Sequence, residues 1–133
     1  AIPGRKRRGS SVIVYIWSLS GRRAIRLVSL YCSSKFALRG MTEAVAQELE
    51  GSGVTCFSVS PGGMNTSMRQ QTFQDASQQQ HPAFVAQVIV DAIAGRIVVP
   101  QGWDLVVRNG HYIAVSRESW TGIVREPGQA VPV

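Results

Sequence analysis

Three side chains near the start of the sequence have the types and spacing needed for proton transfer at a carbonyl or alcohol group. Tyr31 and Lys35 form a Tyr-x-x-x-Lys pair, and Ser18 precedes the tyrosine by 13 residues. A hydroxyl can hold a substrate oxygen, and a phenol can act as the general acid or base. An ammonium group one helical turn away favours the phenolate. Ser18, Tyr31 and Lys35 are therefore the candidate catalytic residues.

Each part of this triplet has a simpler interpretation when it is taken alone. Residues four apart share one face of a helix, so Tyr31 and Lys35 could be a solvated surface pair. Ser20 is a rival for the role of Ser18, although it stands two residues closer to the tyrosine. We favour Ser18, and the hypothesis depends on the elements around it.

Those elements predict a strand, a helix and a second strand. Residues 11–18 are almost continuously apolar, as in a strand covered on both faces. Residues 30–50 have the apolar periodicity of a helix, which Gly51 and Gly53 would end. Residues 54–60 form the second apolar strand. This order predicts a right-handed crossover in a parallel sheet, and hence an α/β fold with three layers.

The rest of the chain adds shorter elements. The Gln-rich residues 64–80 are either a loop or a lid over a site, and Pro82 opens a helix that Gly95 ends. We expect short strands at residues 97–100, 104–107 and 112–115, the last after an Asn109-Gly110 turn. Residues 1–125 would form one partial domain, and residues 126–133 a flexible tail.

Composition excludes several classes of protein. No apolar run reaches the roughly 18 residues that a membrane span needs. The net charge of +6 suggests nucleic-acid binding, but no aromatic platform or zinc spacing accompanies the arginines, which include Arg22, Arg23 and Arg26. We favour the solvated end of a truncated helix and a charged loop. Cys32 and Cys56 are expected to be free thiols in a reducing cytoplasm. His81 and His111 are expected at the surface, and no metal site is predicted.

The motifs resemble the short-chain dehydrogenase/reductase family. The resemblance rests on an apolar strand with Ser18-Leu19-Ser20-Gly21, on Tyr31 and Lys35, and on the run from Pro61 to Thr66, which reads Pro-Gly-Gly-Met-Asn-Thr. It implies a Rossmann-like fold and NAD- or NADP-dependent oxidation of a small alcohol or reduction of a carbonyl. It further implies that Tyr31 and Lys35 also bind the cofactor, Lys35 at the nicotinamide ribose. Pro61, Gly62 and Thr66 would contact the nicotinamide.

The sequence also departs from the family pattern. The Gly-rich turn that cradles the dinucleotide pyrophosphate is absent. Trp17 stands where the family usually has a small residue, which could alter substrate access. We therefore expect the carboxyl-terminal, catalytic half of such a domain, with the last strands of its sheet and little turnover by itself. Its first strand would have an open edge, favouring a homo-oligomer or a complementing fragment. The alternative is a non-catalytic remnant that serves as an oligomerisation or interaction module.

Overall fold

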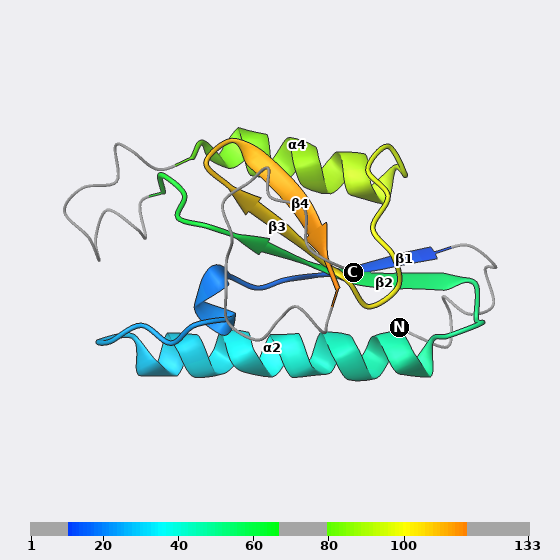
Figure 1. The fold of residues 1–133 in the computed structure, drawn as a ribbon, viewed down its shortest axis with the longest axis horizontal. Coiled ribbons are helices and arrows are strands. Elements are labelled where there is room, and N and C mark those ends of the chain that lie inside the picture. The colour runs from blue at the N-terminus through cyan, green and yellow to red at the C-terminus, as the bar shows by residue number, and fades with distance from the viewer. Residues whose placement is uncertain (1–10, 67–79, 117–133) are drawn as a thin grey trace.

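The sheet holds the fold together in the computed structural model, which describes residues 11–66 and 80–116 (Figure 1). Its strands lie in the order β1-β2-β3-β4. The first three are parallel, and β4 runs antiparallel to β3. The bounds are β1 (Ser11–Ile16), β2 (Val54–Pro61), β3 (Asp104–Arg108) and β4 (His111–Val115). Parallel strands place their carboxyl ends at one edge of the sheet, where ligands bind in open α/β folds.

The helix α2 (Ser29–Glu48) joins β1 to β2 and covers one face of the sheet (Figure 1). Its buried side chains, Val45, Ala46 and the following Leu49, pack against Val54 and Cys56 of β2. Beyond the helix, Gly51 adopts a φ of 69°, a conformation that glycine reaches without strain. The predicted crossover of strand, helix and strand is therefore confirmed.

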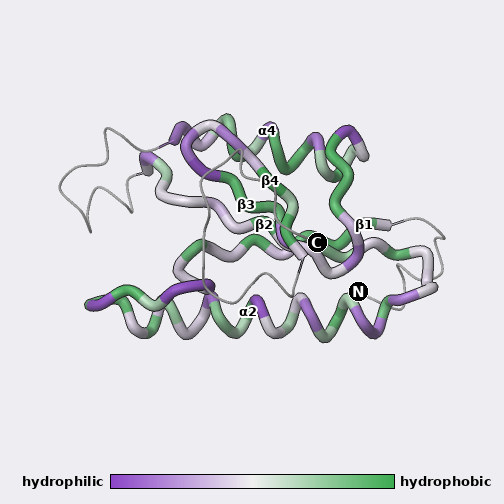
Figure 2. Tube along the Cα trace, in the orientation of Figure 1, coloured by the Kyte–Doolittle hydropathy of each residue, from purple (hydrophilic) through white to green (hydrophobic). Residues whose placement is uncertain are grey.

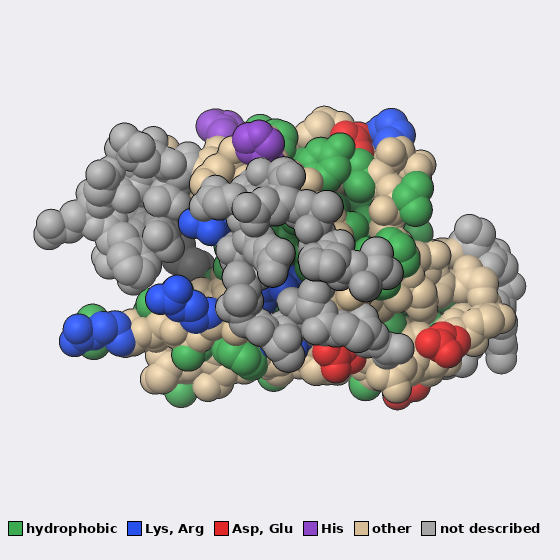
Figure 3. All heavy atoms as spheres, viewed as in Figure 1, with side chains coloured by type: hydrophobic (Ala, Val, Ile, Leu, Met, Phe, Trp, Pro, Cys, Tyr) green, Lys and Arg blue, Asp and Glu red, His purple; other side chains and the backbone are tan. Residues whose placement is uncertain are grey.

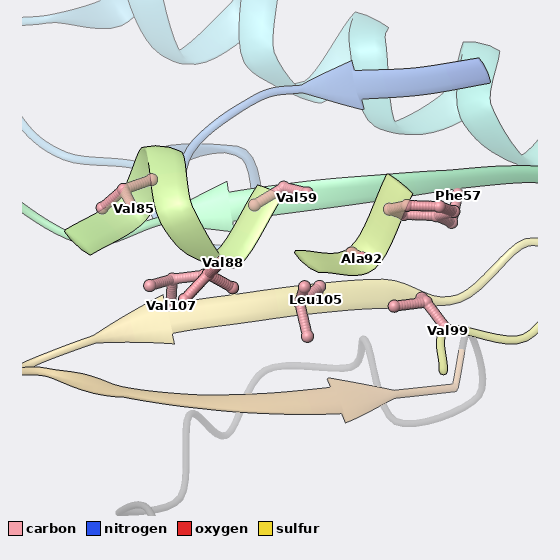
Figure 4. Packing of buried hydrophobic residues seen from close by; sticks show 8 residues of the cluster. All are labelled: Phe57, Val59, Val85, Val88, Ala92, Val99, Leu105 and Val107. Carbon is pink, nitrogen blue, oxygen red and sulfur yellow. The ribbon is translucent and has the colours of Figure 1, made fainter. Parts of the chain in front are cut away.

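The opposite face of the sheet carries the main core. There α4 (Pro82–Ile93) packs its buried face on β2 and β3 (Figure 4). Figure 2 shows the apolar residues concentrated in α4 and the strands, whereas α2 is mixed along its length. The two helices and the sheet between them make the three layers that the sequence predicts. The cluster consists of Phe57, Val59, Val85, Val88, Ala92, Val99, Leu105 and Val107.

A short turn, η1 (Leu19–Gly21), lies between β1 and α2. It is a 3-10 helix that the sequence analysis did not predict. The strand expected at residues 97–100 is wrong, because those residues form no strand and Val98 is 79% exposed. Pro100 also lacks the N–H group that a paired strand would need. The predicted strand after the Asn109-Gly110 turn is confirmed as β4.

The two cysteines and the two histidines lie where the sequence suggested. Cys32 and Cys56 are both buried and free. His81 and His111 are exposed. Among the helices of the described residues, none has the length and apolar character needed to cross a bilayer. The predicted tail at 126–133 and most of the predicted loop or lid at 64–80 lie outside the described residues.

Candidate active site

Ser18 begins the η1 turn, directly beyond the end of β1. The N–H of Trp17 donates to the Val59 carbonyl at 3.0 Å, so pairing with β2 continues to the residue before Ser18. The Ser18 Oγ then accepts a hydrogen bond from the Ser20 N–H at 3.2 Å, as an N-cap residue does. Ser18 is partly exposed, whereas its rival Ser20 is buried. Of the two hydroxyl groups, that of Ser18 is therefore the more accessible to a substrate.

Tyr31 and Lys35 lie one turn apart at the start of α2. The Lys35 Nζ is 5.4 Å from the centroid of the Tyr31 ring, which places the ammonium group against the face of the phenol. Tyr31 is 42% exposed and Lys35 is partly buried. This arrangement leaves the phenol open to a bound molecule while its cationic neighbour stays close.

Gly21 brings the Ser18 turn into contact with the helix that carries Tyr31 and Lys35. A Cβ atom at Gly21 would lie 2.9 Å from the Lys35 carbonyl oxygen and would overlap the ring of Trp17. Only glycine permits so close an approach of the turn to the α2 backbone. The loop that leads from η1 to α2 is held as well, since the Ile25 N–H donates to the Cys32 Sγ at 3.4 Å.

The Pro61-Gly62 turn reaches the same region from the end of β2. The Gly62 N–H donates to the Val107 carbonyl at 2.8 Å. A Cβ atom at Gly62 would lie 3.5 Å from Leu19 Cδ1 and 3.2 Å from Arg108 Cγ, so Gly62 sits between η1 and the end of β3. The carboxyl edge of the sheet thus joins the Ser18 turn to the Pro61-Gly62 turn.

The chain that follows Gly62 is tied back to the sheet by Gln80. Met64 and Gln80 form an isolated parallel bridge, and the Asn65 N–H donates to the Gln80 carbonyl at 3.1 Å. The buried Gln80 side chain donates from Nε2 to the Val107 carbonyl at 3.0 Å. Thr66, the last described residue of this segment, is partly buried. The two ends of the segment therefore meet beside the candidate site.

Positive charge gathers at this end of the molecule. Figure 3 shows basic side chains over the start of α2 and the nearby end of the sheet, and acidic ones over the other end of α2. No group of three potential metal ligands occurs within residues 11–66 and 80–116. Cys56, whose pKa burial raises to about 11, lies in β2 under α2, where it is a packing residue.

A buried ion pair beside the site was missed in the sequence. Arg22 was read with its neighbours as part of a solvated, charged loop, but its side chain is only 6% exposed and it pairs with the fully buried Asp104. Arg23 and Arg26 are exposed, as that reading expected. No local pattern links two residues that are 82 positions apart. The signal in the sequence was Asp104, a charged residue at the start of an apolar strand.

Comparisons with known proteins agree with these motifs. A family model described as short chain dehydrogenase matches residues 1–77. The ketoacyl reductase HetN of Nostoc sp. is 36% identical over 99 residues, which is 71% of this chain and 34% of the relative. The 2,3-dihydro-2,3-dihydroxybenzoate dehydrogenase of Escherichia coli is 33% identical over 99 residues, which is 73% of this chain and 40% of the relative.

A solved structure gives the same picture in three dimensions. It is described as an NAD(P)-dependent gluconate 5-dehydrogenase from Beutenbergia cavernae, with NADP bound at low occupancy. The TM-score is 0.68 and the identity 26%, over 81% of this chain and 48% of the other. This chain therefore spans between a third and a half of the length of the proteins that it matches here.

Proposed function

The chain belongs to the short chain dehydrogenase family, and from that premise we propose that it carries the catalytic residues of an NAD(P)-dependent oxidoreductase. The reaction is the interconversion of an alcohol and a carbonyl group in a small molecule. One observation carries the proposal: Gly21 packs on the Lys35 carbonyl, so the Ser18 turn rests on the helix of Tyr31 and Lys35. This contact supports the proposal because general acid–base catalysis requires that the hydroxyl, the phenol and the ammonium group act at one substrate atom.

In the direction of reduction, Tyr31 gives its phenolic proton to the substrate oxygen as the carbonyl becomes an alcohol. The Ser18 hydroxyl donates a hydrogen bond to that oxygen and holds it in place. The Lys35 ammonium group, 5.4 Å from the Tyr31 ring, stabilises the phenolate that remains. In the direction of oxidation the same phenolate takes the proton of the alcohol. A bound nicotinamide supplies or accepts the hydride.

The residues present fit the nicotinamide end of a dinucleotide. Tyr31 is open, Lys35 is beside it, and the Gly62 backbone reaches the same edge with no side chain of its own. Lys35 and Tyr31 would hold the ribose, while Pro61, Gly62 and Thr66 would contact the nicotinamide. No described turn has the Gly-rich pattern for a pyrophosphate. Because NAD and NADP are identical at the nicotinamide end, the proposal leaves them as equal alternatives.

Turnover of Tyr31→Phe tests the proposal. We expect the loss of the phenolic hydroxyl to lower turnover with NADH or NADPH and small carbonyl substrates by about 100-fold or more. The matched control is Tyr112→Phe, since Tyr112 is 49% exposed on β4. Equal and measurable activity in Tyr31→Phe and the wild type would remove Tyr31 from the mechanism. Titration by NAD(P)H fluorescence measures cofactor binding independently of turnover.

A second function is favoured by the exposed apolar side chains around the start of α2. Leu27 is 90% exposed and Leu30 is 88% exposed, and Phe36 and Met41 are also open. This surface supports the alternative of a non-catalytic oligomerisation or interaction module. Self-association without any binding of NADH or NADPH would favour that alternative. Binding and turnover by a monomer would exclude it.

We further propose a reducing, cytoplasmic location for the protein. Cys32 and Cys56 are both free, and each is packed in the interior of the described residues. Unpaired buried thiols are typical of proteins that fold where disulfides do not form. Fluorescence microscopy of the tagged protein in its own cell, with a secreted protein as reference, is the measurement, and an extracytoplasmic signal would contradict it.

A further inference from the structure

A buried charge network lies directly behind the Ser18 turn. The Arg22 guanidinium Nη2 is 2.5 Å from the Oδ2 of Asp104, whose side chain is 0% exposed. Two serine hydroxyls of β2 complete the shell of the carboxylate: Ser58 donates to Oδ1 at 2.7 Å and Ser60 to Oδ2 at 2.5 Å. Each carboxylate oxygen therefore accepts at least one hydrogen bond, which a buried charge requires.

The network connects the turn to the two central strands. Arg22 is the residue after η1, and its own N–H donates to the Leu19 carbonyl at 3.0 Å. Its guanidinium carbon lies 5.5 Å from the centroid of the Trp17 ring. Asp104 is the first residue of β3, which pairs with β2. The side chain of Arg22 thus reaches from the η1 turn, past Trp17, into the face of the sheet that α2 covers.

We propose that Arg22 and Asp104 are positioning residues that hold the Ser18 turn in its place against α2. The role of Ser18 in this inference rests on the proposed function. The effect of Arg22 and Asp104 on the position of the turn can be tested without catalysis. A 3-10 helix of three residues has little stability of its own, so its position is set by outside contacts. Within the described residues these contacts include Gly21 on the Lys35 backbone, Leu19 on Val106 and Val115, and Arg22 on Asp104.

A positioning role differs from a contribution to stability. A buried ion pair gives little net stability over an apolar pair of similar volume, because desolvation offsets the attraction. Its hydrogen bonds nevertheless define one geometry, and an apolar pair does not. Replacement of both charges also removes the acceptor of the Ser58 and Ser60 hydroxyls, so some stability is lost, but the sheet should stay folded while the turn loosens. An experiment can therefore compare the protection of the turn with the protection of the sheet in the same variant.

The experiment is amide hydrogen exchange, measured by NMR on the whole chain. The variants are Asp104→Asn, Arg22→Lys and the apolar double variant Arg22→Met with Asp104→Val. The probes are the η1 amides: the Gly21 N–H bonds to Ser18 at 2.8 Å, and the Arg22 and Arg23 N–H groups bond to Leu19 at 3.0 and 3.2 Å. The reference probes are β2 amides outside the network, such as that of Cys56, which donates to the Gln101 Oε1 at 2.8 Å.

In the double variant we expect the η1 amides to exchange at least about tenfold faster than in the wild type, while the β2 amides keep their protection. Arg22→Lys should keep part of the η1 protection that the double variant loses, because lysine retains the positive charge. Asp91→Asn is the control, since it breaks an ion pair with Arg96 that is largely exposed. The control should change neither set of amides.

Two results would overturn the inference. The first is η1 protection in the double variant equal to that of the wild type, which would show that the other contacts of the turn hold it without the ion pair. The second is an equal loss of amide protection in η1 and β2 in the double variant, or η1 amides that are already unprotected in the wild type. Either outcome would leave the ion pair without a specific role at the turn. Failure of the proposed function is distinguishable, because a chain without NAD(P)H turnover still reports its exchange rates.

Discussion

At the scale of single residues, Trp17 explains the form of the Ser18 turn. The sequence analysis expected this large side chain to alter substrate access, since it replaces a small residue in the family pattern. In the structure Trp17 is only 2% exposed, and its ring lies against Gly21 and the Arg22 guanidinium. The tryptophan is therefore a packing residue beneath the turn. Gly21, which is buried in the turn, leaves the space that the tryptophan ring occupies.

Gly21→Ala is expected to destabilise the chain. Its Cβ would overlap the Trp17 ring and lie 2.9 Å from the Lys35 carbonyl oxygen, which is main chain and cannot rotate away. Overpacking of this kind costs about 1–3 kcal/mol. Urea unfolding followed by circular dichroism measures the loss.

Gly40→Ala is the matched control for this change. Nothing lies within 4 Å of a Cβ atom at Gly40, which is exposed in the middle of α2. Alanine should stabilise the helix there by about 0.5–1 kcal/mol. Equal effects of the two substitutions would show that the close packing at Gly21 does not exist in solution.

At the scale of elements, α4 shows that a surface residue can still have a structural role. The sequence predicted Pro82 at the first turn and an exposed His81, and both are confirmed. It did not predict that His81 would be the N-cap, with its Nδ1 accepting a hydrogen bond from the Ala83 N–H at 3.1 Å. Histidine is not among the preferred N-cap residues, so the local sequence does not indicate this cap.

His81→Ala should weaken α4 by about 0.5–2 kcal/mol, because an N–H group at the helix start loses its acceptor. His81→Asn should keep the cap and the stability. His111→Ala is the control, because His111 is also exposed and its Nδ1 lies 2.9 Å from the nearby Asn109 carbonyl oxygen. Thermal unfolding of the three variants is the measurement. Wild-type stability in His81→Ala would rule out the cap.

Elements could be predicted where short-range sequence patterns define them, and not where contacts between distant residues do. The α2 and α4 helices follow from apolar periodicity and from glycine or proline at their ends. The strand expected at residues 97–100 failed because a β-branched run is also compatible with a turn that buries only Val99 and exposes Val98. The pair of Arg22 with Asp104 could not be predicted, since it depends on how η1 folds back over β2 and β3.

At the scale of the whole molecule, β1 is an edge strand of the described sheet (Figure 1). Ile16, its last residue, is 49% exposed. An open apolar edge can pair with another strand. This agrees with the sequence analysis, which expected a homo-oligomer or a complementing fragment, although association itself stays a prediction.

We expect the chain to self-associate at micromolar concentration through the edge of β1. Light scattering over a dilution series measures the molar mass. Ile16→Lys should reduce the association, because a charged lysine on an edge strand opposes pairing. Val90→Lys is the control, since Val90 is 52% exposed on α4. A clean monomer at all concentrations, or an equal effect of both lysines, would refute association through this edge.

The bridge between Met64 and Gln80 has a consequence for how such a site can change. Because Asn65 and Gln80 are joined by hydrogen bonds, and Gln80 is bonded to β3, the ends of the intervening segment are fixed independently of its content. Doubling the length of a flexible loop between fixed ends costs only about 0.6 kcal/mol. Segments of other lengths and compositions can therefore be grafted between these two residues while Ser18, Tyr31 and Lys35 stay in place.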